Sequence, residues 1–120
     1  MCIRDSYASY VGDLFRTVRF GPAEAHGQAE TMELNYFLER GAVTRSAAGR
    51  YAIDYQKIVG AIADLAKELL AIEATGDGER AQRWFQKYEA IPAELNVALK
   101  TTENIPVDID PVYSFAEKVK

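Results

Sequence analysis

The single histidine of the chain, His26, is the side chain best suited to chemistry near neutral pH. It lies near the start of a predicted helix, and Gly27 beside it leaves room for a ligand or another backbone to come close. Glu30 follows at the i,i+4 spacing, which can bring two ligands to one metal ion or simply place a polar pair in solvent. From the residues alone, His26 can be structural or catalytic.

Two arginines, Arg16 and Arg19, lie one helical turn apart before the Gly21-Pro22 break. Guanidinium groups at this spacing can clamp a substrate carboxylate, because each presents several N–H donors to it. They can equally neutralise Glu24 or the carboxyl end of their own helix. The sequence leaves both roles open.

Other kinds of site find less support in the sequence. The only cysteine, Cys2, excludes an internal disulfide and a cysteine-based zinc site, and we expect no metal ligands in this chain. No serine stands in a Gly-x-Ser-x-Gly motif. The stretch "ATGDGER" lacks the lysine and the preceding strand of a phosphate loop. We interpret it as a turn in which Asp77 caps the next helix.

The composition is that of a soluble globular domain, with 120 residues of which 48% are hydrophobic and 27% are charged. A net charge of -4 leaves no broad basic surface, so we expect neither nucleic acid nor a membrane as a partner. No apolar run approaches the roughly 18 residues of a membrane span. The single cysteine suits a reducing compartment, and we expect a cytoplasmic protein.

The first six residues, "MCIRDS", resemble translated adapter sequence that opens reading frames from assembled environmental DNA. We therefore treat residues 1–6 as an artefact and leave them out of the fold prediction. Residues 7–120 are expected to form one helical region at the carboxyl end of a longer protein. The missing N-terminal part of that protein is then the expected partner of this chain.

Apolar periodicity predicts a mainly α fold, a bundle of about five helices. A loop or small hairpin with Val43 and Tyr51–Ile53 as its arms is expected after the second helix, and 103–120 reads as an extended C-terminal strap. On the second helix, Ala25 and Ala29 are expected to face the core. The predicted helices span residues 7–19, 22–40, 55–75, 78–90 and 93–102.

Three aromatic residues, Trp84, Phe85 and Tyr88, lie on one side of the fourth predicted helix. Aromatic residues at helical spacing are typical of a core, but they also fit a protein-binding patch. A non-catalytic helical interaction module is therefore the alternative function for this chain.

Two stretches resemble the dipeptidyl peptidase III family of zinc metallopeptidases, especially its bacterial members. In "RFGPAEAHGQA", residues 19–29, the Ala-His pair and the following Gln-Ala coincide with the family's motif. In "LLAIEATGDGERAQRWFQKYEAIPAEL", residues 69–95, the helix, the Thr-Gly-Asp turn and the next helix are similar to those of the family. The closing "IPVDIDPVYSF" is also similar, so the resemblance spans about Tyr7 to Phe115.

The resemblance implies an exopeptidase that removes dipeptides from the amino ends of peptides, with His26 binding substrate and stabilising the transition state. The zinc-binding His-Glu-x-x-Gly-His and Glu-Glu-x-x-Ala-Glu or -Asp helices of the family are absent from this sequence. Zinc and the general base are therefore expected in the missing part, and this fragment alone is expected to be inactive and free of zinc. Ala23 and Glu30 replace two arginines of the animal branch, and Arg16 or Arg19 is a candidate to compensate.

Overall fold

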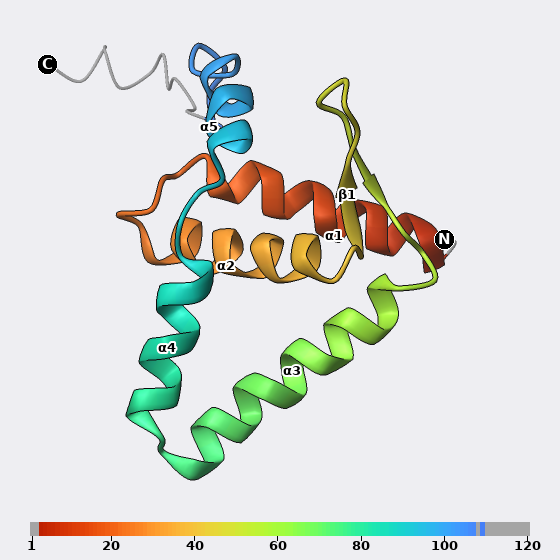
Figure 1. Ribbon diagram of the computed structural model, residues 1–120. Helices are drawn as coiled ribbons and strands as arrows, with labels where there is room; N and C mark the ends of the chain where they lie inside the picture. Colours follow the sequence, from red (N-terminus) through yellow and green to blue (C-terminus); the bar gives the residue numbers. More distant parts are fainter. Residues whose placement is uncertain (1–2, 108, 110–120) are drawn as a thin grey trace, which may run out of the picture.

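The computed structural model describes residues 3–107 and 109, and these form five helices and one β-hairpin (Figure 1). The predicted fold class is confirmed, including the hairpin after the second helix. The expected C-terminal strap lies largely outside the described residues. In the described part of the chain, none of the helices has the length and apolar character to cross a membrane. The elements are α1 (Ile3–Val18), α2 (Ala25–Glu39), β1 (Val43–Arg45), β2 (Tyr51–Ile53), α3 (Ile58–Thr75), α4 (Gly78–Tyr88) and α5 (Ala93–Lys100).

Helix α1 begins at Ile3, four residues before the predicted start at Tyr7. Residues 3–6 are exposed, and they continue the helix because none of them is a glycine or a proline. Downstream, α1 buries Val11, Leu14 and Val18 on one face, as its apolar spacing predicts. The origin of the first six residues stays a prediction.

Helix α2 lies between α1 and the α3–α4 pair (Figure 1). It begins at Ala25, later than the predicted start at Pro22, because Gly21 has a φ of 89° and Glu24 is still extended, with φ -90° and ψ 133°. The prediction that Ala25 and Ala29 face the core is wrong, since both are exposed. The first turns of α2 instead bury the side on which Gly27 lies.

Gly27 packs directly against the turn that joins α1 to α2. A Cβ atom at this position would lie 2.3 Å from the Gly21 carbonyl oxygen, which is far inside contact distance. The glycine expected from the sequence to permit a close approach therefore admits another backbone, and that backbone is the loop before its own helix. This contact fixes where His26, its neighbour, enters the helix.

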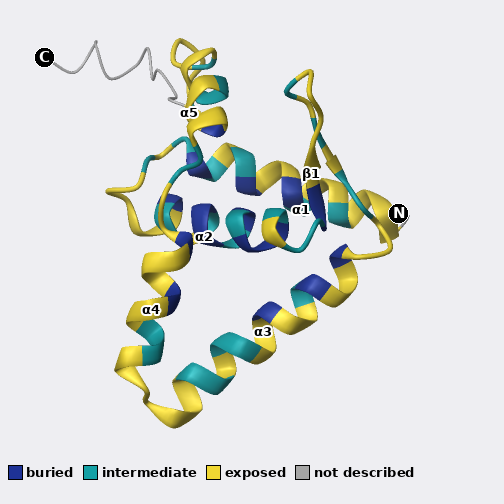
Figure 2. Cartoon of the chain, in the orientation of Figure 1, coloured by how far each residue is buried: buried dark blue, intermediate teal, exposed yellow. Residues whose placement is uncertain are grey.

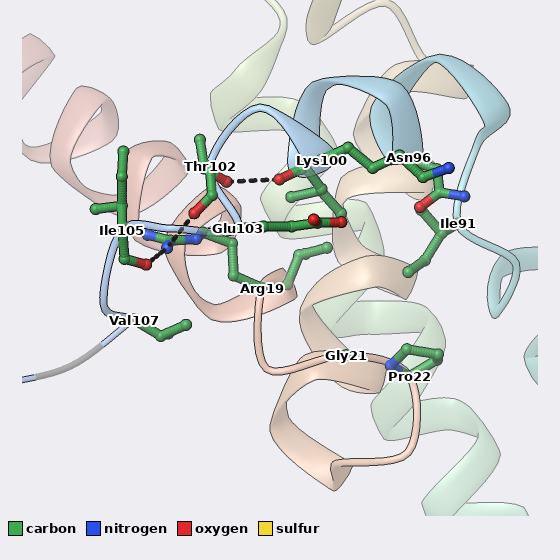
Figure 3. Close-up of a pocket in the computed structure, with 12 residues that line it drawn as sticks. Arg19, Gly21, Pro22, Ile91, Asn96, Lys100, Thr102, Glu103, Ile105 and Val107 are labelled. Atoms are coloured by element: carbon green, nitrogen blue, oxygen red, sulfur yellow. Dashed lines mark hydrogen bonds between the residues drawn. The ribbon is translucent and has the colours of Figure 1, made fainter.

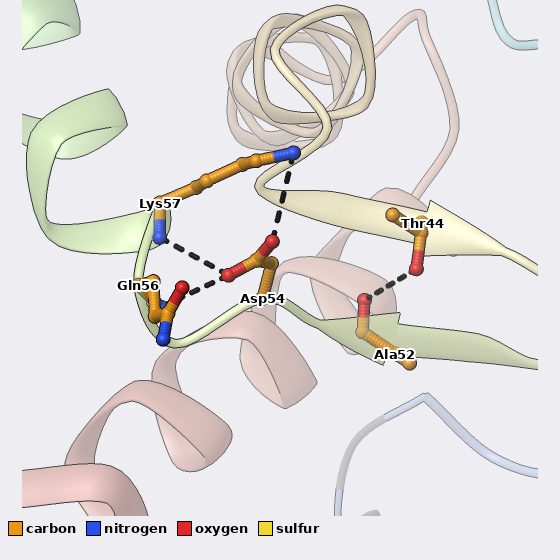
Figure 4. A network of polar contacts seen from close by, with 5 residues as sticks. All are labelled: Thr44, Ala52, Asp54, Gln56 and Lys57. Atoms are coloured by element: carbon orange, nitrogen blue, oxygen red, sulfur yellow. Dashed lines mark hydrogen bonds and ion pairs between the residues drawn. The ribbon is translucent and has the colours of Figure 1, made fainter.

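Helices α3 and α4 have the capping residues that their sequences predict, but α3 begins later than predicted. The Asp54 carboxylate accepts from the backbone N–H groups of Gln56 and Lys57, at 3.0 and 3.2 Å, but regular helix begins at Ile58 (Figure 4). Gly76 ends α3 with a φ of 61°. Asp77 then accepts from the Arg80 N–H at 2.8 Å and caps α4.

Buried residues are concentrated along α2 and the facing side of α1 (Figure 2), and the core that they form includes an aromatic cluster. Tyr36 and Phe37 are both fully buried, and the ring of Tyr36 lies 5.5 Å from that of Tyr88 and 6.4 Å from that of Trp84, between centroids. The protein-binding patch considered for α4 is therefore wrong for Trp84 and Tyr88, which are core residues. Of that trio only Phe85, at 44% exposure, reaches the surface.

In the hairpin, β1 and β2 are antiparallel and Val43 lies opposite Ile53. Gly49 has a φ of 79° in the turn between them. The hairpin packs back on α1, where the rings of Phe15 and Tyr51 lie 4.7 Å apart between centroids.

Gly27→Ala is expected to lower the free energy of unfolding by about 1–3 kcal/mol, because the new methyl group forces the Gly21 backbone to move. Gly12→Ala is the matched control, since Gly12 is also helical but has open space around its Cα; it is expected to stabilise by up to about 1 kcal/mol. Urea denaturation measures both variants. Equal stabilisation of the two would contradict the Gly21–Gly27 contact.

Candidate functional site

An open hollow of about 370 Å³ lies where the end of α1 meets the start of α2. Both helices and the turn between them contribute side chains, so its shape depends on how the two helices are joined. The lining residues are Asp13, Arg16 and Thr17 from α1, Phe20 and Glu24 from the connecting segment, and His26 and Glu30 from α2. The hollow therefore contains cationic, anionic and imidazole groups together.

His26 is the second residue of α2, and its side chain is exposed at the hollow. Among the described residues, none forms a hydrogen bond with its imidazole. The ring is therefore available to an incoming group. The first N–H groups of a helix have no partners within the helix, so this end of α2 also suits negative charge.

The structure brings one of the two predicted arginines to the same hollow as His26. Arg16 lines the hollow and forms an exposed ion pair with Asp13 at 3.3 Å. Exposed pairs of this kind contribute at most about 1 kcal/mol, so another carboxylate can compete for the guanidinium.

Arg19 lies elsewhere, in a hollow of about 350 Å³ between the α1–α2 turn and the segment after α5 (Figure 3). Its guanidinium donates to the Thr102 carbonyl at 3.1 Å and to the Ile105 carbonyl. Arg19 therefore ties the segment after α5 to the end of α1, and the structure does not bring it together with His26.

The acidic side of the His26 hollow is formed by Glu30. Burial raises the pKa of its carboxyl above the usual value, the charges of Glu33 and Asp13 raise it further, and His26 opposes them. Its Oε2 atom is buried without a hydrogen-bond partner among the described residues. Glu33, in contrast, accepts from the Tyr10 hydroxyl. Glu30 is therefore the carboxyl group that can hold a proton beside the imidazole.

Sequence reasoning missed three residues of this hollow, Asp13, Thr17 and Phe20. Asp13 and Arg16 are three residues apart on α1, and Asp13 and Thr17 are four apart, which does predict that they share a helix face. What the spacing does not reveal is that this face of α1 is the one turned toward His26.

The described residues provide no ligand set for the zinc ion that the sequence resemblance implies for the longer protein. Among the described residues, no group of three or more His, Cys, Asp or Glu side chains lies close enough together to hold a metal ion. His26 and Glu30 provide two candidate donors at most. The described residues therefore do not fit a zinc site.

Comparison with curated proteins gives one relative over nearly the whole chain. The chain is 36% identical over 117 residues to "Nudix hydrolase 3" of Arabidopsis thaliana, a match that covers 96% of this chain and 15% of that protein. No family model matches. Since the match is to so small a share of the relative, the activity in its name is a property of the longer protein and is not transferred to this chain.

Comparison with solved structures gives close matches in both sequence and fold. Dipeptidyl-peptidase III from Corallococcus sp. strain EGB superposes with a TM-score of 0.84 at 33% identity, over 93% of this chain and 21% of that one. The enzyme from Caldithrix abyssi gives a TM-score of 0.85 at 31% identity, over 95% and 22%. The chain spans about a fifth of these proteins, and it is similar to a segment of dipeptidyl-peptidase III, as its motifs predict.

Arg19→Ala is expected to cost about 1 kcal/mol of stability, because it removes charged hydrogen bonds to two carbonyl groups. Arg16→Ala, which removes the exposed ion pair with Asp13, is expected to change stability by less than about 0.5 kcal/mol. Urea denaturation of the two variants measures the difference. A larger loss for Arg16→Ala would contradict the structural role given to Arg19.

Glu30→Gln is expected to stabilise the chain at neutral pH and to have no such effect below the ordinary carboxyl pKa of 4.5. Because the pKa of Glu30 is raised in the folded state, stability linked to its proton is present below the unfolded pKa and is lost as pH rises through the folded pKa. Thermal melting as a function of pH measures the effect. Glu79→Gln, whose side chain is 89% exposed, is the control and should show no gain with rising pH.

Proposed function

We propose that this chain, which is similar in sequence and fold to a segment of dipeptidyl-peptidase III, is part of a zinc-dependent exopeptidase that releases dipeptides from the amino ends of peptides. The observation that best supports this is the position of His26, exposed at a polar hollow in a segment that superposes on that enzyme with a TM-score of 0.84. Apart from Cys2, which lies in the six residues treated as an artefact, the chain has no cysteine; this suits a reducing compartment, and we propose a cytoplasmic location.

In this proposal His26 contacts the peptide at the carbonyl group that is attacked. An imidazole N–H directed at the developing oxyanion stabilises the transition state more than the ground state, which is how such a donor accelerates acyl transfer. The exposure of the ring and its freedom from hydrogen bonds to the described residues support this role. Glu30 lines the same hollow, and burial raises the pKa of its carboxyl.

Arg16 is the proposed contact for a carboxylate of the peptide. It lines the same hollow as His26, and its ion pair with the Asp13 carboxylate supports the proposal that it can bind a carboxylate of the peptide. Arg19 was the other candidate for substrate binding. Because its guanidinium already donates to two backbone carbonyl groups, we assign it a structural role instead.

The zinc ion of the proposed enzyme would be held by the N-terminal part of the longer protein, since the described residues of this chain do not fit a zinc site. When bound, zinc supplies an activated water and polarises the scissile carbonyl. This chain would contribute the residues that bind the peptide and stabilise the negative charge of the transition state. Its partners are then the peptide substrate and that N-terminal part.

The alternative function, a non-catalytic helical interaction module, has weaker support. It rested on the aromatic residues of α4, and two of them, Trp84 and Tyr88, contact Tyr36 in the core. Phe85 alone is a single exposed hydrophobic residue, which is ordinary on a protein surface.

In the longer protein that carries zinc, His26→Ala is expected to lower kcat about 100- to 1,000-fold while the zinc content stays unchanged, as for the loss of one oxyanion donor. Release of dipeptides from a short peptide and metal analysis of the same sample provide the two readouts. Gln82→Ala, an exposed change on α4, is the control.

Equal losses of zinc and activity in His26→Ala would identify a metal ligand or a structural residue instead. Full activity of the variant would overturn the catalytic role. Stoichiometric zinc in the separate 120-residue chain would contradict the placement of the metal site.

A further inference from the structure

A third hollow, separate from those of His26 and Arg19, lies between the end of α2 and helices α3 and α4. Its volume is about 340 Å³, and its charged lining consists of Arg40, Arg80, Arg83 and Lys87 with one carboxylate, Glu68. The proposed peptidase chemistry does not use these residues, although Arg80, Arg83 and Lys87 lie within the second stretch that resembles the family. The chain as a whole carries a net charge of -4, so this local excess of cations is unusual for it.

Arg40 is the first residue here whose bonding is incomplete. Its guanidinium carbon lies 3.3 Å from the centroid of the Tyr36 ring, and its Nη1 atom is buried without a hydrogen-bond partner among the described residues. The cation–π contact offsets part of the cost of burying the charge, but an N–H group away from water still lacks an acceptor. Hydrogen bonds from a guanidinium to an oxyanion are among the strongest in proteins, so an oxyanion is the acceptor that suits this N–H group best.

Trp84 is the second residue with an unmet donor at the same hollow. Its side chain is buried, with 8% of the residue exposed, and its indole N–H has no hydrogen-bond partner among the described residues. Buried polar atoms in native proteins are almost always hydrogen-bonded. The described part of the chain contains three buried side-chain polar atoms without a partner, and two of them, both donors, belong to residues that line this one hollow.

The cationic side chains around the hollow are only partly neutralised by neighbouring carboxylates. Lys87 pairs with Glu39 at 2.8 Å and Arg83 pairs with Glu79 at 3.5 Å, so these two cations are already partly neutralised. Among the described residues, neither Arg40 nor Arg80 forms an ion pair. Glu68 is the one carboxylate in the lining of this hollow, and that lining has a net positive charge. Arg40 and Arg80 also line an adjoining hollow, together with Asp64, Lys67 and Glu68.

We propose that this hollow, formed by Arg40, Arg80 and Trp84, is a binding site for an oxyanion, either a phosphate group or a carboxylate. Guanidinium groups recognise both through paired N–H donors, and the indole N–H adds a donor that discriminates against ligands without an acceptor atom. The site is independent of the His26 hollow and does not rest on the proposed peptidase function.

The single tryptophan of the chain makes the test direct, because Trp84 is itself part of the site. The 120-residue chain is titrated with inorganic phosphate and with acetate, against chloride at equal ionic strength. Trp84 fluorescence and its indole N–H signal in NMR spectra are the readouts. Either oxyanion is expected to give a saturable change that chloride does not, and the preferred anion identifies a phosphorylated ligand or a carboxylate.

Arg80→Gln is the test variant, because Arg80 is only half-buried and its loss should not unfold the chain. It is expected to weaken anion binding about tenfold or more, as for the loss of one charged hydrogen bond. Arg45→Gln, an equal change of charge on the exposed hairpin, is the control and should bind as the unchanged chain does. An equal loss in both variants, or no saturable response to either anion, would overturn the proposal.

Discussion

The structure depends on the burial of two neighbouring aromatic residues of α2, Tyr36 and Phe37. Consecutive residues of a helix point about 100° apart, so they serve two different partners. Tyr36 packs against Trp84 and Tyr88 of α4, whereas the ring of Phe37 lies 6.2 Å from that of Tyr10 of α1, between centroids. Because both are fully buried, α2 is held from two sides and the other helices are placed relative to it.

Both candidate sites follow from this central position of α2. At its N-terminus, the contact of Gly27 with the Gly21 backbone fixes the turn from α1, which brings Arg16 to the hollow of His26. At its carboxyl end, Arg40 extends over the Tyr36 ring and lines the hollow formed with α4. A positively charged side chain at that end of a helix is also favoured by the helix dipole. The same buried pair therefore supports two polar sites of different character.

Several features of this fold can be predicted from short stretches of the sequence, because their physical causes are local. Asp77 caps α4 and Gly76 ends α3 as expected, since capping needs only a side-chain oxygen or a positive φ within a few residues. The hairpin arms at Val43 and Tyr51–Ile53 were equally predictable. The exposure of Ala25 and Ala29 was not, because which side of a helix is covered depends on where its neighbours lie.

The sequence by itself determined the helices, the cap of α4, the end of α3, the hairpin and the likeness to dipeptidyl-peptidase III, because periodicity, capping and motifs are properties of short stretches. Only the tertiary structure decided that Arg16 shares a hollow with His26 while Arg19 binds the segment after α5. It likewise decided that Trp84 is a core residue whose indole N–H has no hydrogen-bond partner among the described residues. These outcomes depend on how helices distant in sequence pack on one another, which no i,i+4 spacing encodes.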